Sequence, residues 1–403
     1  MKPFGQLLDF DTALQTVLTE TPQIKTSESV DLDNLAGRVL AEDIFAVLSI
    51  PPFNRAAMDG YAVIAEDTFG AGRRNPCQLK IIGHIYAGDS PALCLKRGEA
   101  IQIATGAPMP DGADAVVMVE ETDKSGEDVL VFKAVYPGAN IGRAGEDINE
   151  GECILARGTV FDAGKIGVLA SQGLSEAAVL HKPRIAVMPT GEEIAAFGEM
   201  LRPGQIYDIN SHTISAVIRQ SGGKPDKMPI AEDKPDRLQA AIEKALEADM
   251  VVISGGSSVG ERDLMFGILE KLGKLLFHGI QVKPGKPTMF AVVNGKPVLG
   301  MPGYPTSCLI NAYLLLAPAV RKMAGLPVDD GHVVEAELDQ SVPGSVGRRQ
   351  FLPVKVQNGL AIPLFKESGA ITATAEADGY LDIPQNVDIL DKGQLVSVHL
   401  FGC

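Results

Sequence analysis

The sequence predicts a multidomain α/β protein, and three observations support this fold class. Short apolar runs alternate with amphipathic segments over residues 179–327, a pattern typical of a parallel sheet with right-handed crossovers. Short β-type runs separated by Gly, Pro and Asp occupy residues 51–140, and a second group of such runs follows residue 327. At 403 residues the chain is too long for one ordinary hydrophobic core, so two to four domains are expected.

Composition and charge limit the classes of partner. Hydrophobic residues make up 45% of the chain and charged residues 22%, as in globular proteins, and no apolar run approaches the length of a membrane span. The formal net charge of −15 argues against a general nucleic-acid binder and against a protein of anionic membranes. An anionic substrate would therefore need locally concentrated basic residues.

The cysteines and histidines indicate a reducing compartment and no zinc site. The cysteines are few and scattered, without CxxC spacing, and Met1–Leu8 lacks the pattern of a signal peptide. We therefore expect free thiols and a cytoplasmic protein. The histidines include no pair at the spacing of zinc ligands.

Residues 249–323 contain the strongest candidate for a ligand site. The apolar strand Asp249–Ile253 leads into the loop Ser254–Gly260, and a helix is expected from about Glu261 to just before Gly273. The backbone N–H groups of such a loop are able to hold an anion. A lone Gly/Ser loop, however, is more often a tight turn.

Further strand ends follow the Gly/Ser loop. A strand over Leu275–Val282 leads into the turn Lys283–Pro287, Asn294-Gly295 predicts a hairpin, and the strand Pro297–Met301 leads into Pro302–Ser307. Successive strand ends thus bring small, hydroxyl-bearing and cationic residues to the carboxyl edge, where open α/β sheets bind ligands.

Lys283 and Lys286 have two interpretations. As isolated residues they would be solvated surface charges, whereas their joint placement at neighbouring strand ends favours an anion site. The turn is not a nucleotide-binding P-loop, because Pro287 follows Gly285-Lys286 where a Ser or Thr would hold Mg²⁺.

Three acidic residues, Glu193, Asp233 and Asp263, are expected at the same carboxyl edge. Glu193 follows the predicted strand Arg184–Met188, and Asp233 precedes a helix whose Leu238 belongs to a core-facing stripe. For Asp233, capping of that helix and a functional role are equally good interpretations.

Polar residues elsewhere also allow structural interpretations. The N-terminal helix Asp11–Thr19 is expected to have Asp11 as its cap. Asp59-Gly60 is locally best explained as a hairpin turn, and Thr105 is either a turn hydroxyl or a ligand.

The C-terminal segment predicts a small β-barrel or sandwich. Arg348-Arg349, expected on a connecting loop, is its main basic feature. Its short alternating runs are Val333–Leu338, Phe351–Val356, Leu360–Leu364 and Gln394–Leu400.

In chain order, these motifs resemble the molybdopterin molybdenumtransferase family, also called MoeA, which includes the gephyrin E domain. The resemblance covers nearly the whole chain, and its specificity lies in the ordered combination. The segments that carry it are Pro52-Phe53, Met58–Val63, Thr105–Pro108, Gly145–Ile148, Thr190–Glu193, Ser254–Gly260, Lys283–Pro287 and Pro302–Pro305.

The resemblance implies four domains in each subunit of a homodimer with a composite active site. It also implies transient contacts with other cofactor-biosynthesis proteins. The expected domains are an extended linking and dimer domain (1–50 and 141–178), a mainly-β insertion domain (51–140), a central parallel α/β domain that is molybdopterin-binding-like (179–327), and a C-terminal β-barrel domain (328–403).

The implied reaction inserts molybdenum, supplied as molybdate, into adenylated molybdopterin and releases AMP. Mg²⁺ would be held by carboxylates, and the dianionic molybdate by cationic and hydroxyl groups. The catalytic positions that match are Asp59, Thr105, Glu193, Asp233 and Asp263, the last three also as ligands of Mg²⁺. The matching substrate and oxyanion positions are Ser257, Lys283, Lys286, Pro302, Pro305 and Arg348.

Several positions depart from the family pattern and leave alternatives open. Tyr304 stands where Asn is common, Asp378-Gly379 replaces Asn-Gly, and Pro353 stands where Arg is frequent. Because these positions surround the expected oxyanion site, a tungstate-specific insertase is an alternative function. A molybdopterin adenylyltransferase and a scaffold that keeps only the fold are two further alternatives. The additional domains argue against the adenylyltransferase, and the joint presence of the acidic residues and lysines argues against the scaffold.

Overall fold

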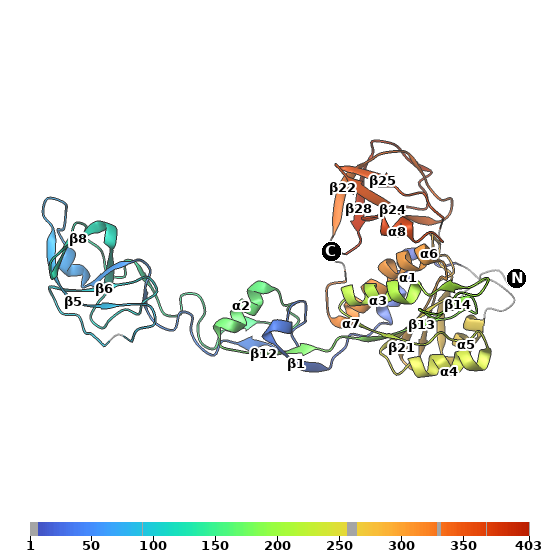
Figure 1. Ribbon diagram of the computed structural model, residues 1–403, viewed down its shortest axis with the longest axis horizontal. Coiled ribbons are helices and arrows are strands. Elements are labelled where there is room, and N and C mark those ends of the chain that lie inside the picture. The colour runs from blue at the N-terminus through green and yellow to red at the C-terminus, as the bar shows by residue number, and fades with distance from the viewer. Residues whose placement is uncertain (1–6, 91, 256–263, 329–331, 368, 403) are drawn as a thin grey trace. The chain divides into compact units, whose positions relative to one another are not determined.

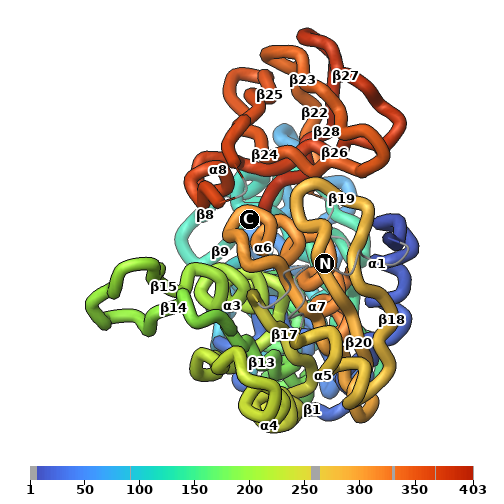
Figure 2. Tube along the Cα trace, turned by 90° about the vertical axis from the view of Figure 1, so that its right-hand side faces the viewer, coloured from blue at the N-terminus to red at the C-terminus, as the bar shows by residue number. Residues whose placement is uncertain are grey.

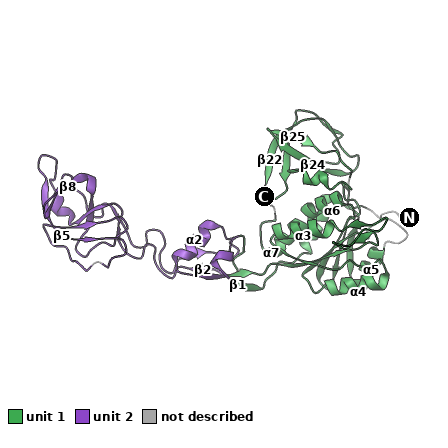
Figure 3. Ribbon diagram, in the orientation of Figure 1, with its two compact units in different colours: residues 1–29, 37–41, 178–403 green, residues 30–36, 42–177 purple. Residues whose placement is uncertain are grey.

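The chain forms two compact units, which are described separately (Figure 3). Unit 1 contains an α/β domain and a β-barrel, and unit 2 contains a mainly-β domain. Unit 1 comprises Met1–Ser29, Gly37–Ala41 and Ala178–Cys403, and unit 2 comprises Val30–Ala36 and Glu42–Ala177. The computed structural model describes residues 7–90, 92–255, 264–328, 332–367 and 369–402.

The α/β domain, in which Figure 1 labels β13 and β21, is built on a six-stranded sheet with the order β16-β13-β17-β21-β20-β18. The first four strands of this order are parallel, as the strand–helix alternation predicts. β17 is buried at every position, which explains its uninterrupted apolar sequence. The strands are β13 (Arg184–Pro189), β16 (Lys224–Lys227), β17 (Met250–Ser254), β18 (Lys274–His278), β20 (Met289–Val293) and β21 (Lys296–Met301).

Helices cover both faces of this sheet. On β13, Ile185 and Val187 belong to one hydrophobic cluster, and Ala186 and Met188 belong to another, because side chains alternate along a strand. The first cluster includes α1 (Phe10–Thr19), α3 (Asn210–Gln220), α6 (Pro305–Asn311), the π-helical turn η4 (Ala312–Leu316) and α7 (Ala317–Ala324). The second includes α4 (Pro235–Ala245) and α5 (Leu264–Leu272).

One end of the sheet is antiparallel. β20 and β21 form the predicted hairpin, and Asn294 and Gly295 adopt φ values of +51° and +76°, as this two-residue turn requires. The strand expected over Leu275–Val282 is divided, because the chain leaves β18 at Gly279, whose φ is +98°. Its last part forms β19 (Val282–Lys283), which pairs with a strand of the barrel.

The cap of the first helix is Asp9, and the expectation of Asp11 was wrong. Asp9 has extended backbone angles, and its carboxylate accepts a hydrogen bond from the backbone N–H of Thr12 at 2.9 Å. Asp11 lies inside the helix, where its carboxylate accepts a hydrogen bond from Arg349 Nη1 at 2.7 Å.

The C-terminal strands close into a barrel around their own hydrophobic cluster, which confirms the barrel prediction. Arg349 lies in a barrel strand, contrary to the expected loop, and its Nε donates to Asp382 at 2.7 Å. In order around the barrel the strands are β24 (Arg349–Gln357), β25 (Leu360–Pro363), β22 (Val333–Leu338), β28 (Leu395–Leu400) and β26 (Gly379–Ile383), which pairs again with β24. A short pair, β23 (Val342–Pro343) and β27 (Ile389–Leu390), and the helix α8 (Thr372–Ala375) lie between them in sequence.

Unit 2 contains a second six-stranded sheet with the order β7-β4-β6-β5-β9-β8. Tyr61 and Val63 on one face of β4, and Ala62 on the other, belong to separate hydrophobic clusters. The strands are β4 (Gly60–Val63), β5 (Cys77–Ile85), β6 (Glu99–Ile103), β7 (Ala115–Met118), β8 (Thr122–Ser125) and β9 (Asp128–Val131). Shorter elements are β2 (Ile44–Phe45), β3 (Arg55–Ala56), β10 (Ile141–Gly142), β11 (Cys153–Leu155) and α2 (Ala163–Ser171).

Asp59-Gly60 does not form the expected hairpin turn. β3 before it pairs with β10, whereas β4 after it pairs with β6 and β7, so the flanking strands are not partners. Among the described residues, no helix is both long and apolar enough to cross a membrane.

Candidate active site

A cavity of about 680 Å³, hereafter the edge cavity, lies at the carboxyl edge of the α/β sheet. β13 and β17 reach it with Pro189 and Ser254, and the segment after β21 reaches it with Pro302 and Pro305. These strand ends meet, as expected from their sequence, at the edge where open α/β sheets commonly bind ligands.

An arm of the α/β domain forms one wall of the edge cavity. It contains β14 (Ile194–Ala195) and β15 (Ile206–Tyr207), which pair in parallel, and Figure 2 shows it projecting from the domain. Ile194, Ile206 and Tyr207 line the cavity from this arm. The apolar side chains make this wall suitable for a flat organic ring.

Gly255 allows the ends of two strands to approach closely. Its φ is +94°, and a Cβ atom there would lie 2.3 Å from the carbonyl oxygen of Thr190. A larger residue would force the end of β17 away from the end of β13, so glycine is required in this wall. The rest of the predicted Gly/Ser loop, including Ser257, lies outside the described residues.

A second cavity, hereafter the basic cavity, adjoins the first and has a volume of about 390 Å³. It lies between the turn Lys283–Pro287, the start of α6 and the barrel, and it shares Lys286, Pro287 and Ser307 with the edge cavity. The cationic residues that line it are Lys283, Lys286, Arg348 and Lys366, of which Lys366 pairs with Glu376 at 2.6 Å. Among the described residues, Glu367 is the one acid in the lining. In a chain of net charge −15, this local excess of cations is typical of an anion site.

Asn311 holds the turn that carries both lysines. Its Nδ2 donates to the carbonyl oxygen of Gly285 at 3.0 Å and to Thr288 Oγ1 at 2.5 Å, and its side chain is fully buried. Gly285 has a φ of +99°, and a Cβ atom there would lie 2.3 Å from Asn311 Nδ2. Sequence analysis missed Asn311, although a single amide inside an apolar helix was a usable signal.

The acidic residues differ in their surroundings. Glu193 is exposed and lines the edge cavity. Asp233 accepts a hydrogen bond from the hydroxyl of Thr190, a buried residue that also lines the cavity. Asp233 is not the cap of α4, because that helix begins after Lys234 and has no side-chain cap. Asp263 lies outside the described residues.

The described residues contain no group of three His, Cys, Asp or Glu side chains that could hold a metal ion. This does not oppose Mg²⁺, which commonly takes only one or two protein carboxylates and completes its shell with water and phosphate oxygens. Glu193 and Asp233 are carboxylates of this kind, one in the cavity wall and one bonded to a wall residue.

In unit 2, Asp59 and Thr105 are brought together although they are distant in sequence. Asp59 Oδ1 accepts hydrogen bonds from the backbone N–H of Thr105 at 2.7 Å and from its hydroxyl at 2.9 Å. These two bonds, the backbone one foremost, lower the pKa of the Asp59 carboxyl below its ordinary value. The exposed pair therefore presents an ionised carboxylate in a fixed orientation.

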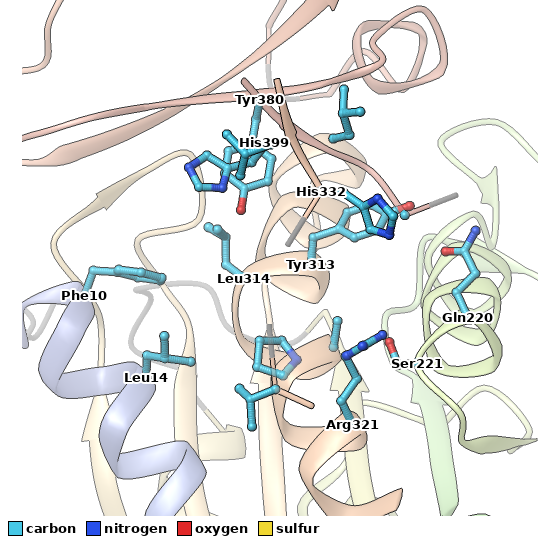
Figure 4. Close-up of a pocket in the computed structure, with 16 residues that line it drawn as sticks. Phe10, Leu14, Gln220, Ser221, Tyr313, Leu314, Arg321, His332, Tyr380 and His399 are labelled. Carbon is cyan, nitrogen blue, oxygen red and sulfur yellow. The ribbon is translucent and has the colours of Figure 1, made fainter. Parts of the chain in front are cut away.

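A third cavity, of about 430 Å³, lies between the α/β domain and the barrel in unit 1 (Figure 4). Figure 4 shows Tyr380 and His399 side by side at its barrel wall. Their rings are stacked, with 5.2 Å between the ring centroids. His332 and Arg321 are further polar groups of the lining. It shares no lining residue with the other two cavities, and no predicted site residue lines it.

Three protein-family models match the chain in succession. They are described as "MoeA N-terminal region (domain I and II)" over residues 8–173, "Probable molybdopterin binding domain" over residues 186–322, and "MoeA C-terminal region (domain IV)" over residues 335–401. The second covers the strands and helices around the edge cavity, and the third covers the barrel.

Curated relatives match over almost their full length. Molybdopterin molybdenumtransferase 2 of Mycobacterium tuberculosis is 36% identical over 396 residues, which cover 95% of this chain and 97% of that protein. Molybdopterin molybdenumtransferase of Staphylococcus epidermidis is 32% identical over 395 residues, which cover 96% of this chain and 94% of that protein.

Solved structures agree with the sequence comparisons. A crystal structure of the molybdopterin biosynthesis MoeA protein from Pyrococcus horikoshii is 42% identical, has a TM-score of 0.87, and covers 98% of this chain and 99% of that chain. A second structure of a MoeA protein from the same organism is 32% identical with a TM-score of 0.85. The chain therefore belongs to the MoeA family.

Proposed function

We propose that the protein is a molybdopterin molybdenumtransferase, which inserts molybdenum from molybdate into the dithiolene of adenylated molybdopterin and releases AMP. The observation that carries this proposal is the junction of two unlike cavities at Lys286 and Ser307. The edge cavity has mostly apolar walls and the volume of a small-molecule site, whereas the basic cavity suits a compact dianion. A pterin and an oxyanion bound in them would meet at the shared residues.

The basic cavity binds and orients the oxyanion. Lys283, Lys286 and Arg348 line it together, so their charges offset the two negative charges of molybdate, and Ser307 adds a hydroxyl donor. The two dithiolene thiols of the substrate then replace one oxide ligand of the metal, and their two protons leave with that oxide as water, so the oxidation state of the metal does not change. The cavity residues stay hydrogen-bond donors to the oxides throughout.

The acidic residues act on the adenylate side. Glu193 and Asp233, together with Asp263, would hold Mg²⁺, which when bound neutralises charge on the adenylate phosphate. Asp233 is oriented by the Thr190 hydroxyl, and Thr190 reaches the edge cavity. Cleavage of the adenylate therefore takes place within the cavity that holds the pterin, with Pro302 and Pro305 in its wall.

The active site is completed by a second subunit of a homodimer. Asp59 and Thr105 form a preoriented, ionised pair on the exposed surface of unit 2, remote in sequence from every residue of the two cavities. In a two-fold dimer, this pair from each subunit serves the cavities of the other, which creates two equivalent composite sites. The described cysteines are free thiols, in keeping with a cytoplasmic reaction.

The test is a metal-insertion assay with purified protein. The protein is incubated with adenylated molybdopterin, Mg²⁺ and either molybdate or tungstate, and AMP and pterin-bound metal are measured by liquid chromatography with mass spectrometry. The proposal expects metal-bound pterin and AMP with molybdate. A protein that instead converts molybdopterin and ATP into the adenylate, or that inserts only tungsten, would overturn it.

A further inference from the structure

Arg349 ties the barrel to the α/β domain through two carboxylates. Its Nε donates to Asp382 Oδ1 at 2.7 Å and its Nη2 donates to Asp382 Oδ2, which forms a bidentate pair within the barrel. Its Nη1 donates at 2.7 Å to Asp11 Oδ1, on helix α1, which packs on the α/β sheet. The guanidinium also lies over the ring of Phe10 in α1, 4.9 Å from the ring centroid. Asp11, Arg349 and Asp382 are hereafter the clamp.

The backbone at Arg349 sets the register between the barrel and the turn that carries Lys283. The backbone N–H of Arg349 donates to the carbonyl oxygen of Gln281 at 2.9 Å, and β19 pairs with β24 so that Lys283 lies opposite Gln350. Side chains alternate along a strand, so Arg349 points to one face of β24 and its two neighbours to the other. These neighbours, Arg348 and Gln350, line the basic cavity with Lys283, whereas Arg349 is not part of that lining.

Arg348 depends on this backbone for its place in the basic cavity. Its side chain is half-buried, and no hydrogen bond or ion pair fixes its guanidinium within the part of the chain that the structure describes. Because β19 comprises only two residues, few backbone bonds hold the joint beside it, and the clamp reinforces this joint. A shift of the barrel against the α/β domain would move Arg348 relative to Lys286, which lies on the turn of the α/β domain.

We propose that Arg349 is a positioning residue: by clamping the barrel to α1, it holds Arg348 beside the lysines of the basic cavity and so completes the oxyanion site. The inference rests on the proposed function, because it concerns how the basic cavity binds its oxyanion. Arg349 acts through Arg348 and does not itself touch the ligand. The two carboxylates of the clamp are negative, so their charges oppose the binding of an anion, and they favour it only through position.

Asp11→Ala separates position from charge. The variant breaks the bond between Arg349 and α1 but leaves the pair within the barrel intact, and the fold should survive because the Asp11 side chain is 76% exposed. Removal of a negative charge would by itself strengthen the binding of an anion. Loss of the tie should instead weaken molybdate binding roughly two- to fivefold, the effect of an exposed ion pair, as measured by isothermal titration calorimetry.

Asp9→Asn is the matched control. It removes the same charge two residues away, and asparagine still caps α1, as Asp9 does by accepting a hydrogen bond from the backbone N–H of Thr12 at 2.9 Å. Molybdate should bind this variant as tightly as wild type or more tightly. An affinity that rises or stays unchanged in Asp11→Ala, or that falls equally in Asp9→Asn, would overturn the inference.

A double-mutant cycle tests whether Arg349 acts through Arg348. Arg349→Met removes both ion pairs of the clamp and should weaken molybdate binding about tenfold in the otherwise native protein. In a protein that already carries Arg348→Ala, the same change should cost less than about twofold, because the residue that Arg349 positions is gone. An equal loss in both proteins would mean general damage or a long-range effect of charge, and would overturn the inference.

Arg184→Met is the control for the loss of an arginine. Arg184 Nη2 pairs with Asp226 at 3.0 Å between β13 and β16, and neither residue lines any of the three cavities. Molybdate affinity should stay at the wild-type value, and a loss as large as that in Arg349→Met would overturn the inference. A wild type that binds molybdate while the cycle is additive contradicts this inference alone, whereas a wild type that binds no molybdate contradicts the proposed function.

Discussion

Lys286→Ala is expected to weaken oxyanion binding more than Lys283→Ala, and to weaken pterin binding as well. Lys286 is half-buried and lines both cavities, whereas Lys283 is exposed and lines only the basic cavity. A charged hydrogen bond contributes about 1.5–3 kcal/mol, and partial burial places Lys286 toward the upper value. The expected loss of molybdate affinity is roughly 30- to 150-fold for Lys286→Ala and about tenfold for Lys283→Ala.

Isothermal titration calorimetry with molybdate and tungstate measures these losses. Lys296→Ala is the matched control, because it removes the same charge at the opposite end of β21, where Lys296 Nζ donates to the carbonyl oxygen of Leu246 at 2.6 Å. Repeating the titrations at higher salt should weaken wild-type binding, since salt screens the cationic cluster. Unchanged binding in both cavity variants, or an equal loss in Lys296→Ala, would refute the assignment of the anion site.

Three further predictions concern the acidic residues. Glu193→Gln should lower Mg²⁺-dependent AMP release roughly tenfold or more. The melting temperature should not fall, because the carboxylate is exposed. A lower melting temperature with full turnover would indicate a structural role. Mixing inactive Asp59→Ala and Lys286→Ala subunits should restore about a quarter of wild-type activity. Random pairing makes half of the dimers mixed, and each mixed dimer has one intact site out of two. No recovery despite subunit exchange would contradict the composite site. The lowered pKa of Asp59 means that its bonds to Thr105 stabilise the protein at neutral pH and that this contribution is lost as the pH falls through that pKa. Thr105→Val should raise the pKa of Asp59 in a carboxyl NMR titration, and an unchanged midpoint would contradict the role of the hydroxyl.

The sequence predicts the elements whose pattern is local. β17 was recognisable because a strand buried on both faces needs an uninterrupted apolar run, and Asn294-Gly295 because few residues tolerate positive φ at two successive positions. The ordered motifs also predicted the MoeA family, which the comparisons confirm. The four domain boundaries and the roles of the site residues stay predictions.

Contacts between distant segments could not be predicted from local patterns. The break at Gly279 depends on pairing of the following residues with the barrel, and the bond between Asp59 and Thr105 spans 46 residues. Asp11 was expected to cap the first helix, but its carboxylate pairs with Arg349, which is 338 residues away in the chain.

Coupling between AMP release and metal insertion tests the proposed function most directly. Purified protein is given adenylated molybdopterin and Mg²⁺ with or without molybdate, and AMP and pterin-bound molybdenum are quantified in the same samples. Because the two cavities meet at Lys286, we expect AMP and metal-bound pterin to appear in equimolar amounts. The yields of both products should fall in Lys286→Ala. Metal insertion without AMP release, or AMP release that yields no metal-bound pterin in the presence of molybdate, would contradict the account.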